Sequence, residues 1–201
     1  MRKMGFVFVL MAMTTSAAQG LDSLYAPAPP ANSAFVRVLN ATAVTVDATI
    51  SNKVISVPKF GVGDYLVIPR GNILVSSKKS SATFSINEGK FYSAIWNGRA
   101  FKMITDVSHD NRAKALLIVY NMSSFPGLDL KTADGQLAIV TKIPAGESGS
   151  RAVNGITVDL AAFNGNKMLT NFKGVSLERG KAYSIVITDA GSSLTVNTTA
   201  K

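Results

Sequence analysis

Short runs of apolar residues, separated by turn residues, follow one another along most of the chain. The runs are rich in β-branched and aromatic residues, and Gly, Pro or Asn interrupts them roughly every 8–12 positions. We find no stretch with apolar residues at the i, i+3, i+4 and i+7 spacing of a surface helix. The pattern predicts strands in the first half over residues 35–39, 44–50, 65–68, 73–76, 82–86, 91–96 and 101–105. Short strands at this spacing are typical of a β-sandwich.

Turn residues cluster between these runs. Residues 58–63, 69–72 and 87–89 contain Gly, Pro or Asn and predict turns. Asn97 and Gly98 stand between two apolar runs, and this dipeptide is a strong hairpin signal. It predicts a tight turn in which both residues have a positive φ.

The pattern of the first half returns in the second half. Residues 84–95 align without a gap with residues 175–186, and the Ser, Gly, Lys, Tyr and Ser positions recur. Upstream, residues 35–40 resemble residues 116–121, and both segments end in Asn. An internal repeat of this length favours two small domains over one large domain.

We therefore predict an all-β fold of two tandem β-sandwich domains that arose by internal duplication. The expected domains span residues 34–106 and 115–201, and a short polar linker, residues 107–114, joins them. A linker of this kind permits relative motion of the domains without demonstrating it.

The repeated Gly-Lys turn allows two interpretations. Gly89 and Gly180 supply the positive φ of a tight turn, and Lys90 and Lys181 follow at the exposed start of a strand. The tyrosine two positions after each lysine lies on the same face of its strand. The favoured interpretation is a structural turn with a packed tyrosine, and the alternative is a pair of equivalent Lys/Tyr ligand sites.

The N-terminal segment has the layout of a secretory signal peptide. Arg2 and Lys3 precede an apolar run over residues 4–13, and small or polar residues follow. Cleavage is expected after Gly20, with Ala18 as an alternative. An apolar run of ten residues is too short for a membrane span, which takes about 20. We therefore expect an exported, periplasmic protein that does not itself span the membrane.

Removal of residues 1–20 changes the charge and exposes a proline-rich arm. The segment contains two basic residues and no acid, so the formal net charge falls from +9 to +7. Residues 21–33 hold three prolines and show no periodicity, which predicts an extended arm. The remaining basic residues are dispersed and are not interleaved with aromatic residues, so nucleic-acid binding is not expected. A diffuse positive field attracts an anionic polymer or an acidic partner.

Composition excludes several kinds of chemistry. The chain has no Cys and one His, so it has no thiol nucleophile, no disulfide and no site with several histidines. Ser108, His109 and Asp110 are neighbours in the linker, where they cannot generally reach the geometry of a catalytic triad. Serine motifs at residues 76–79 and 146–150 lack the partners and the turn that their enzyme families require. We expect no cofactor, no metal and no catalytic residue, although counting alone does not exclude a carboxylate pair for glycoside hydrolysis.

The single tryptophan offers another candidate for binding. Trp96 precedes the expected hairpin turn and Arg99 follows it. An exposed Trp with a nearby Arg is a typical composition for an interface anchor. The alternative interpretation is a Trp in the core of the first sandwich.

Five short segments stand out as a set, namely residues 24–27 (Leu-Tyr-Ala-Pro), 33–41, 129–135, 143–146 and 176–180. Together they resemble the AlgF family of periplasmic alginate O-acetylation proteins. Their order and spacing agree with the family over nearly the whole mature chain, and residues 51–80 agree least. Any surface specific to that region is therefore not covered by the resemblance.

The resemblance implies a non-catalytic adaptor in the acetylation of alginate. It implies as partners a membrane O-acyltransferase and separate periplasmic SGNH-type acetyltransferases, which carry the Ser-His-Asp chemistry. The alternatives are a carbohydrate-binding module for an anionic polysaccharide, an acetyl-relay subunit and a generic exported repeat protein. The candidate binding residues are Tyr25, Lys90, Trp96, Arg99 and Lys181.

Overall fold

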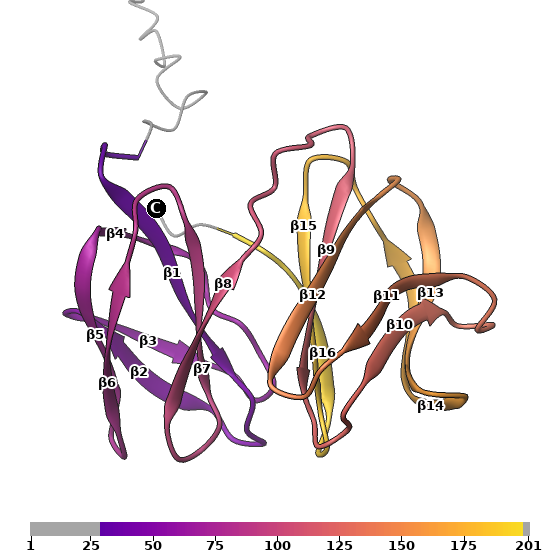
Figure 1. Ribbon diagram of the computed structural model, residues 1–201, viewed down its shortest axis with the longest axis horizontal. Coiled ribbons are helices and arrows are strands. Elements are labelled where there is room, and N and C mark those ends of the chain that lie inside the picture. The colour runs from indigo at the N-terminus through magenta and orange to yellow at the C-terminus, as the bar shows by residue number, and fades with distance from the viewer. Residues whose placement is uncertain (1–28, 199–201) are drawn as a thin grey trace, which may run out of the picture.

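The computed structural model describes residues 29–198, and that part of the chain consists of strands, turns and loops without a helix (Figure 1). The predicted signal peptide and Tyr25 lie outside the described residues, as does the predicted arm up to residue 28. Between residues 29 and 198 no helix is long and apolar enough to cross a membrane.

The first half of the chain forms a sandwich of two four-stranded sheets. Its strands are β1 (Ser33–Asn40), β2 (Val46–Ile50), β3 (Lys53–Val57), β4 (Leu66–Pro69), β5 (Gly71–Ser77), β6 (Ser81–Ile86), β7 (Phe91–Trp96) and β8 (Phe101–Asp106). One sheet has the order β4-β1-β7-β8 and the other has the order β3-β2-β5-β6. Apolar side chains from both sheets, including Val36, Val38, Ile50 and Val75, fill the core between them.

The second half repeats this arrangement. Its strands are β9 (Ala115–Met122), β10 (Leu128–Thr132), β11 (Ala138–Ile143), β12 (Glu147–Val153), β13 (Thr157–Asn164), β14 (Lys167–Ser176), β15 (Ala182–Thr188) and β16 (Ser192–Val196). The sheet orders, β12-β9-β15-β16 and β11-β10-β13-β14, are those of the first half with every strand number raised by eight. The all-β fold of two similar sandwiches is therefore confirmed.

The repeat extends to the pairing register of the central strands. β1 and β7 are parallel with Phe35 opposite Phe91, and β9 and β15 are parallel with Leu116 opposite Ala182. These pairs are equivalent in the sequence alignment of the two halves. Arg37 and Ile118 therefore occupy the same position in the two domains, opposite Ser93 and its counterpart Ser184.

Two local predictions were incomplete or wrong. Strand β3 was missed, because it is an edge strand whose Val54 is 74% exposed and whose alternation of apolar and polar residues is weak. The β7–β8 hairpin exists, but only Gly98 in its turn has a positive φ, of 92°. Asn97 instead accepts hydrogen bonds from the backbone N–H groups of Arg99 and Ala100, which stabilises a four-residue loop.

The two sandwiches pack against each other through their inner sheets. A third apolar cluster contains Leu39, Ile95 and Ile104 from the first half and Leu116, Ile118, Tyr120 and Val186 from the second half. The central strands are therefore buried on both faces, with Val36 and Val38 in the core of the first domain and Leu39 at the interface. The result is a stack of four sheets, which Figure 1 shows side by side.

Hydrogen bonds at the periphery also connect the two halves. The Tyr65 N–H donates to the carbonyl oxygen of Thr198 at 2.9 Å, just after β16. Lys102 on β8 forms an ion pair with Glu147 on β12, with 2.7 Å between Nζ and Oε1. The segment between β8 and β9 is thus only one of several connections between the domains.

Candidate functional site

A buried arginine lies at the centre of the interface between the domains. Arg37 alternates with the core residues of β1, so its side chain points toward the second domain, and its exposed fraction is 0%. Its Nε donates to Ser93 Oγ at 2.9 Å, and its Nη1 donates to Asn197 Oδ1 at 2.9 Å. Its Nη2 donates to the Tyr120 hydroxyl at 2.7 Å and to Ser184 Oγ at 2.8 Å. One guanidinium therefore binds groups from both domains.

Asp106, at the end of β8, is the acidic counterpart of this arginine. Its Oδ2 accepts hydrogen bonds from the hydroxyls of Tyr65 at 2.8 Å and Ser93 at 2.6 Å. Its Oδ1 accepts a hydrogen bond from the Tyr120 hydroxyl at 2.6 Å. The closest approach to the Arg37 guanidinium is 3.9 Å, so the two charges are linked mainly through hydroxyl groups that they share.

Burial keeps the phenols of this network neutral. It raises the pKa of Tyr65 and Tyr120 well above the ordinary value, and although Arg37 opposes this shift, Asp106 adds to it. Burial alone would lower the pKa of Arg37, but its attraction to Tyr120, Tyr65 and Asp106 outweighs that effect and raises it. Both hydroxyls thus remain hydrogen-bond donors to the carboxylate, and the guanidinium stays charged.

This hydrogen-bond network joins the two domains, and we call it the clamp. It consists of Arg37, Asp106, Tyr65, Ser93, Tyr120, Ser184 and Asn197. The Ser93 and Tyr120 hydroxyls each accept a hydrogen bond from the guanidinium and donate one to the carboxylate, whereas the Tyr65 hydroxyl only donates to the carboxylate. The Arg37 guanidinium lies 4.2 Å from the centre of the Tyr65 ring. Within the described residues no buried side-chain nitrogen or oxygen lacks a hydrogen-bond partner. Ser93 has no exposed surface and its oxygen is engaged with both charges, so it is not positioned to attack a substrate from solvent.

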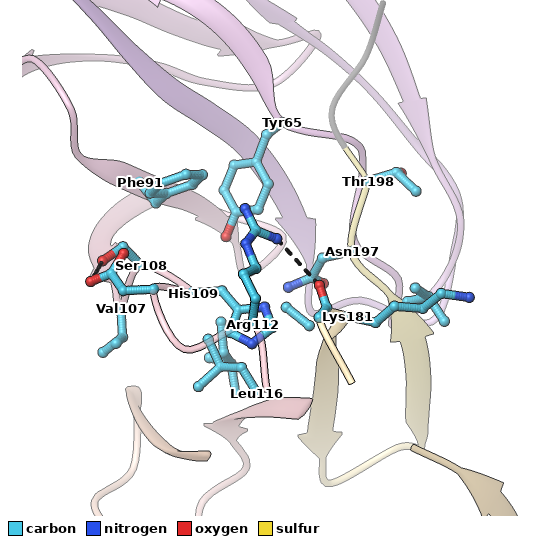
Figure 2. A pocket seen from close by; sticks show the side chains of 15 residues that line it. Tyr65, Phe91, Val107, Ser108, His109, Arg112, Leu116, Lys181, Asn197 and Thr198 are labelled. Atoms are coloured by element: carbon cyan, nitrogen blue, oxygen red, sulfur yellow. Dashed lines mark hydrogen bonds between the residues drawn. The ribbon is translucent and has the colours of Figure 1, made fainter. Parts of the chain in front are cut away.

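A pocket of about 440 Å³ lies between the domains beside this clamp (Figure 2). Tyr65 and Asn197 belong to both, because they line the pocket and hydrogen-bond within the network. The first domain also contributes Phe91, whose ring stacks on Phe35 with 4.4 Å between centroids. The walls of the pocket are thus attached to well-packed elements on both sides.

The polar lining comes largely from the segment between β8 and β9. Figure 2 shows Ser108, His109 and Arg112 from this segment around the pocket, together with Lys181 from the second domain. Arg112 is exposed, and its Nη1 donates to the carbonyl oxygen of Gly180 at 3.2 Å. The hydrogen bond that Lys181 donates to Glu178, together with the negative charge of Glu178, raises the pKa of Lys181, so this lysine remains a cation.

The Ser-His-Asp neighbours in this segment do not form a triad. Ser108 Oγ donates directly to Asp110 Oδ2 at 2.8 Å. His109 Nε2 lies 3.0 Å from the carbonyl oxygen of Lys114, which makes Nε2 the protonated nitrogen. The His109 ring therefore donates a hydrogen bond to the backbone of its own segment and is not positioned as a base toward the neighbouring serine.

Apolar side chains make up the other part of the lining. Leu116 and Ile118 are buried at the pocket, while Val107 and Val196 at its edge are 54% and 42% exposed. A site of this composition can hold an apolar group beside an anionic one. Among residues 29–198 no group of three or more His, Asp or Glu side chains converges as a metal site would require.

The structure distributes the predicted binding residues over separate places. Lys181 lines the pocket, whereas Lys90 is exposed at the turn before β7 and Arg99 is exposed in the β7–β8 loop. Trp96 is only 4% exposed and belongs to the core of the first domain, which was the alternative interpretation. From that position its ring cannot stack on a sugar or serve as a surface anchor. Tyr25 lies outside the described residues.

The tyrosines of the Gly-Lys turns are structural. The Tyr92 hydroxyl accepts a hydrogen bond from the backbone N–H of Asn87, and the Tyr183 hydroxyl accepts one from that of Glu178. Both rings are buried. The packed-tyrosine interpretation of the repeat therefore agrees with the geometry in both domains.

Sequence reasoning missed the Arg37 network, although one signal was present. Arg37 interrupts an apolar strand at a position where the repeat has Ile118. A charge in a strand that is buried on both faces requires a partner. The partners, Asp106 and Asn197, are distant in sequence and carried no local signal.

A family model and relatives of similar sequence indicate one family. The family model described as "Alginate O-acetyl transferase AlgF" matches residues 7–184. The alginate biosynthesis protein AlgF of Pseudomonas syringae pv. tomato is 33% identical over 184 residues, covering 90% of this chain and 82% of the relative. That of Pseudomonas putida is 34% identical over 178 residues, covering 87% and 82%. A solved structure of the C-terminal domain of AlgF from P. aeruginosa matches at 33% identity and a TM-score of 0.37, covering 42% of this chain and 97% of that chain.

Proposed function

The chain belongs to the AlgF family, and from that premise we propose that it is a non-catalytic adaptor in the O-acetylation of alginate. In this proposal it connects a membrane O-acyltransferase to SGNH-type acetyltransferases in the periplasm. The N-terminal segment, residues 1–20, serves as its export signal.

The observation that carries the proposal is that the buried polar residues at the centre of the molecule hold the two domains together. Arg37 and Asp106 bind five side chains from both domains, and these contacts hold two sandwiches in one arrangement. An adaptor needs a rigid body with surfaces at fixed positions, because preorganisation reduces the entropic cost of binding. A catalytic site would instead need an accessible nucleophile next to its base.

The experiment separates a requirement in cells from activity in solution. Deletion of the gene is expected to abolish acetylation of alginate, and the purified protein is expected to release no acetate from an acetyl ester. Turnover by the purified protein, if it were lost on Ser108→Ala, would contradict the proposal, because Ser108 has its hydroxyl at the interdomain pocket. Normal acetylation in the deletion strain would contradict it as well.

A further inference from the structure

We propose that the interdomain pocket beside residues 107–114 is the docking site for a partner protein. The occupant is an extended segment of the SGNH-type acetyltransferase that carries a carboxylate next to an apolar side chain. The inference rests on the proposed adaptor function and adds to it a surface and a chemistry of recognition.

The first argument is the apolar half of the pocket. Val107 and Val196 keep 54% and 42% of their surface exposed, although they line the same pocket as the buried residues Leu116 and Ile118. Phe91 adds an aromatic face on the side of the first domain. These apolar lining residues are suited to bind an aliphatic or aromatic side chain of a partner, because that contact removes apolar surface of both proteins from water.

The second argument is the charge around the pocket. Arg112 projects its guanidinium over the pocket, and in the described part of the chain that group makes one hydrogen bond, to the Gly180 carbonyl oxygen. Lys181 adds a second cation, although its ion pair with Glu178, at 2.8 Å, is exposed. An exposed pair of this kind exchanges partners at little cost. Asp110 is the acidic residue of the lining and accepts a hydrogen bond from Ser108, and the hydrogen bond described for Arg112 goes to a carbonyl oxygen, so an anionic group is favoured beside this arginine.

The third argument is that the pocket is preformed and needs both domains. Tyr65 comes from the first domain, Arg112 from the connecting segment and Lys181 from the second domain. Tyr65 and Asn197 are held from behind by Asp106 and Arg37. Because this wall is fixed before binding, the partner does not have to order it.

The composition favours a peptide over the polysaccharide. A polyuronate presents repeated carboxylates and hydroxyls but no apolar side chain to cover the apolar lining residues Val107, Phe91 and Val196. A peptide presents both groups within a few residues. At about 440 Å³ the pocket falls within the range of roughly 300–1,000 Å³ usual for ligand sites, so it accommodates a short segment and not a folded surface.

The test is calorimetric titration of the full mature chain with the purified soluble acetyltransferase of the same bacterium. Arg112→Glu reverses a charge at the pocket and Val196→Glu places a charge on its apolar edge. Each is expected to weaken binding at least about tenfold. The loss from Arg112→Glu should shrink as salt concentration rises, because the contact is electrostatic.

Two matched variants serve as controls. Lys167→Glu reverses a charge on β14, and Val54→Glu places a charge on β3, both in the outer sheets. Both sites are exposed, and both variants should bind within about twofold of the unchanged chain. Thermal unfolding of all four variants verifies that the fold is retained, and only folded variants are compared.

The outcomes separate the two proposals. If the acetyltransferase binds the unchanged chain and both pocket variants equally, the pocket proposal is wrong and the adaptor function stands. If it does not bind the unchanged chain, both proposals fail. If oligomannuronate binds the unchanged chain and Arg112→Glu abolishes that binding while the acetyltransferase is unaffected, the pocket is a polysaccharide site and the peptide proposal is overturned.

Discussion

The guanidinium of Arg37 lies between two sheets that belong to different halves of the chain. Removing a charge from water costs several kcal/mol, which is recovered only when good hydrogen bonds and an opposite charge replace the water. Arg37 finds four acceptors and a carboxylate at 3.9 Å. Because these partners come from β7, β9, β15 and the segment after β16, the arginine fixes how the domains meet.

Arg37→Met should therefore destabilise the protein strongly. The variant leaves Asp106 buried without its counter-charge, and we expect the free energy of unfolding to fall by about 3–5 kcal/mol in urea titrations. Arg37→Met combined with Asp106→Asn should lose less than the single variant, because no uncompensated charge remains. Arg99→Met, at an exposed site, should stay within about 0.5 kcal/mol. A loss below about 1 kcal/mol for Arg37→Met would show that the clamp contributes little.

The two buried phenols predict a loss of stability in alkali. Burial raises the pKa of Tyr65 and Tyr120 in the folded protein, whereas an unfolded tyrosine loses its proton near pH 10. Above about pH 10 the folded state binds more protons than the unfolded state, so stability falls as the pH rises toward the folded pKa. Each phenol contributes a slope of about 1.4 kcal/mol per pH unit.

Comparison with a double variant isolates this effect. Tyr65→Phe with Tyr120→Phe removes both protons and also weakens the network, so it should be less stable than the unchanged chain at every pH below 9. The difference between the two proteins should shrink above pH 10. A difference that stays constant from pH 7 to 11 in urea titrations would contradict the assigned protonation states.

At the scale of elements, an asparagine near the end of the first strand of each repeat forms the same set of side-chain hydrogen bonds to the backbone. The Asn40 side-chain amide donates to the carbonyl oxygens of Val44 and Val57, and Asn121 donates to those of Phe125 and Ile143. Each side-chain oxygen also accepts the backbone N–H of the residue two positions later. The asparagine thus binds the strand end to the loop that follows it and to the neighbouring sheet.

Asn121→Ala should reduce stability because the Asn121 side chain, which makes these hydrogen bonds, is buried. The variant leaves two carbonyl groups and a backbone N–H without partners, and we expect a loss of about 1–3 kcal/mol. Asn52→Ala in the exposed β2–β3 turn is the control and should change the free energy of unfolding by less than about 0.5 kcal/mol. Equal effects of the two substitutions would refute the capping role.

The elements also show how far sequence patterns reach. Strands of the first half were predicted to within a few residues because turn residues separate their apolar runs, and the repeat identified the second half. β3 was missed because it is short and the exposed Val54 breaks the alternation of apolar and polar residues, although Ile55 and Val57 of the same strand face the core. The domain interface was missed because a strand buried on both faces, such as β9, reads as a continuous apolar run and does not reveal what covers its second face.

The candidate site was harder to predict than the fold. The repeat made Lys181 a candidate, and it lines the pocket, whereas Arg112 and Val196 lie there because of how the domains pack. For Trp96 the sequence offered both a surface anchor and a core residue, and the tertiary structure places it in the core. Sites made by contacts between distant segments carry no spacing that a sequence pattern can report.

At the scale of the whole molecule, the interface makes the two sandwiches one unit. The apolar cluster around Leu39 and Ile118 and the clamp around Arg37 both join the domains. We therefore expect the protein to unfold in a single transition. Trp96 is the single tryptophan and lies in the core of the first domain, so its fluorescence reports that domain alone, whereas far-ultraviolet circular dichroism reports both.

The two signals should have the same urea midpoint in the unchanged chain. Ile118→Glu puts a carboxylate into the apolar interface and should separate the midpoints, because the domains then unfold independently. Separate midpoints in the unchanged chain would mean that the interface does not couple the domains.

The adaptor function is tested most directly by asking whether the protein holds two enzymes together. The measurement is the amount of SGNH-type acetyltransferase that co-purifies with the tagged membrane O-acyltransferase from cells with and without this protein. We predict recovery of both enzymes when the protein is present, loss of the acetyltransferase in the deletion strain, and restoration by the unchanged chain. Equal recovery of the acetyltransferase with and without the protein, in cells whose alginate still loses its acetyl groups on deletion, would contradict the account.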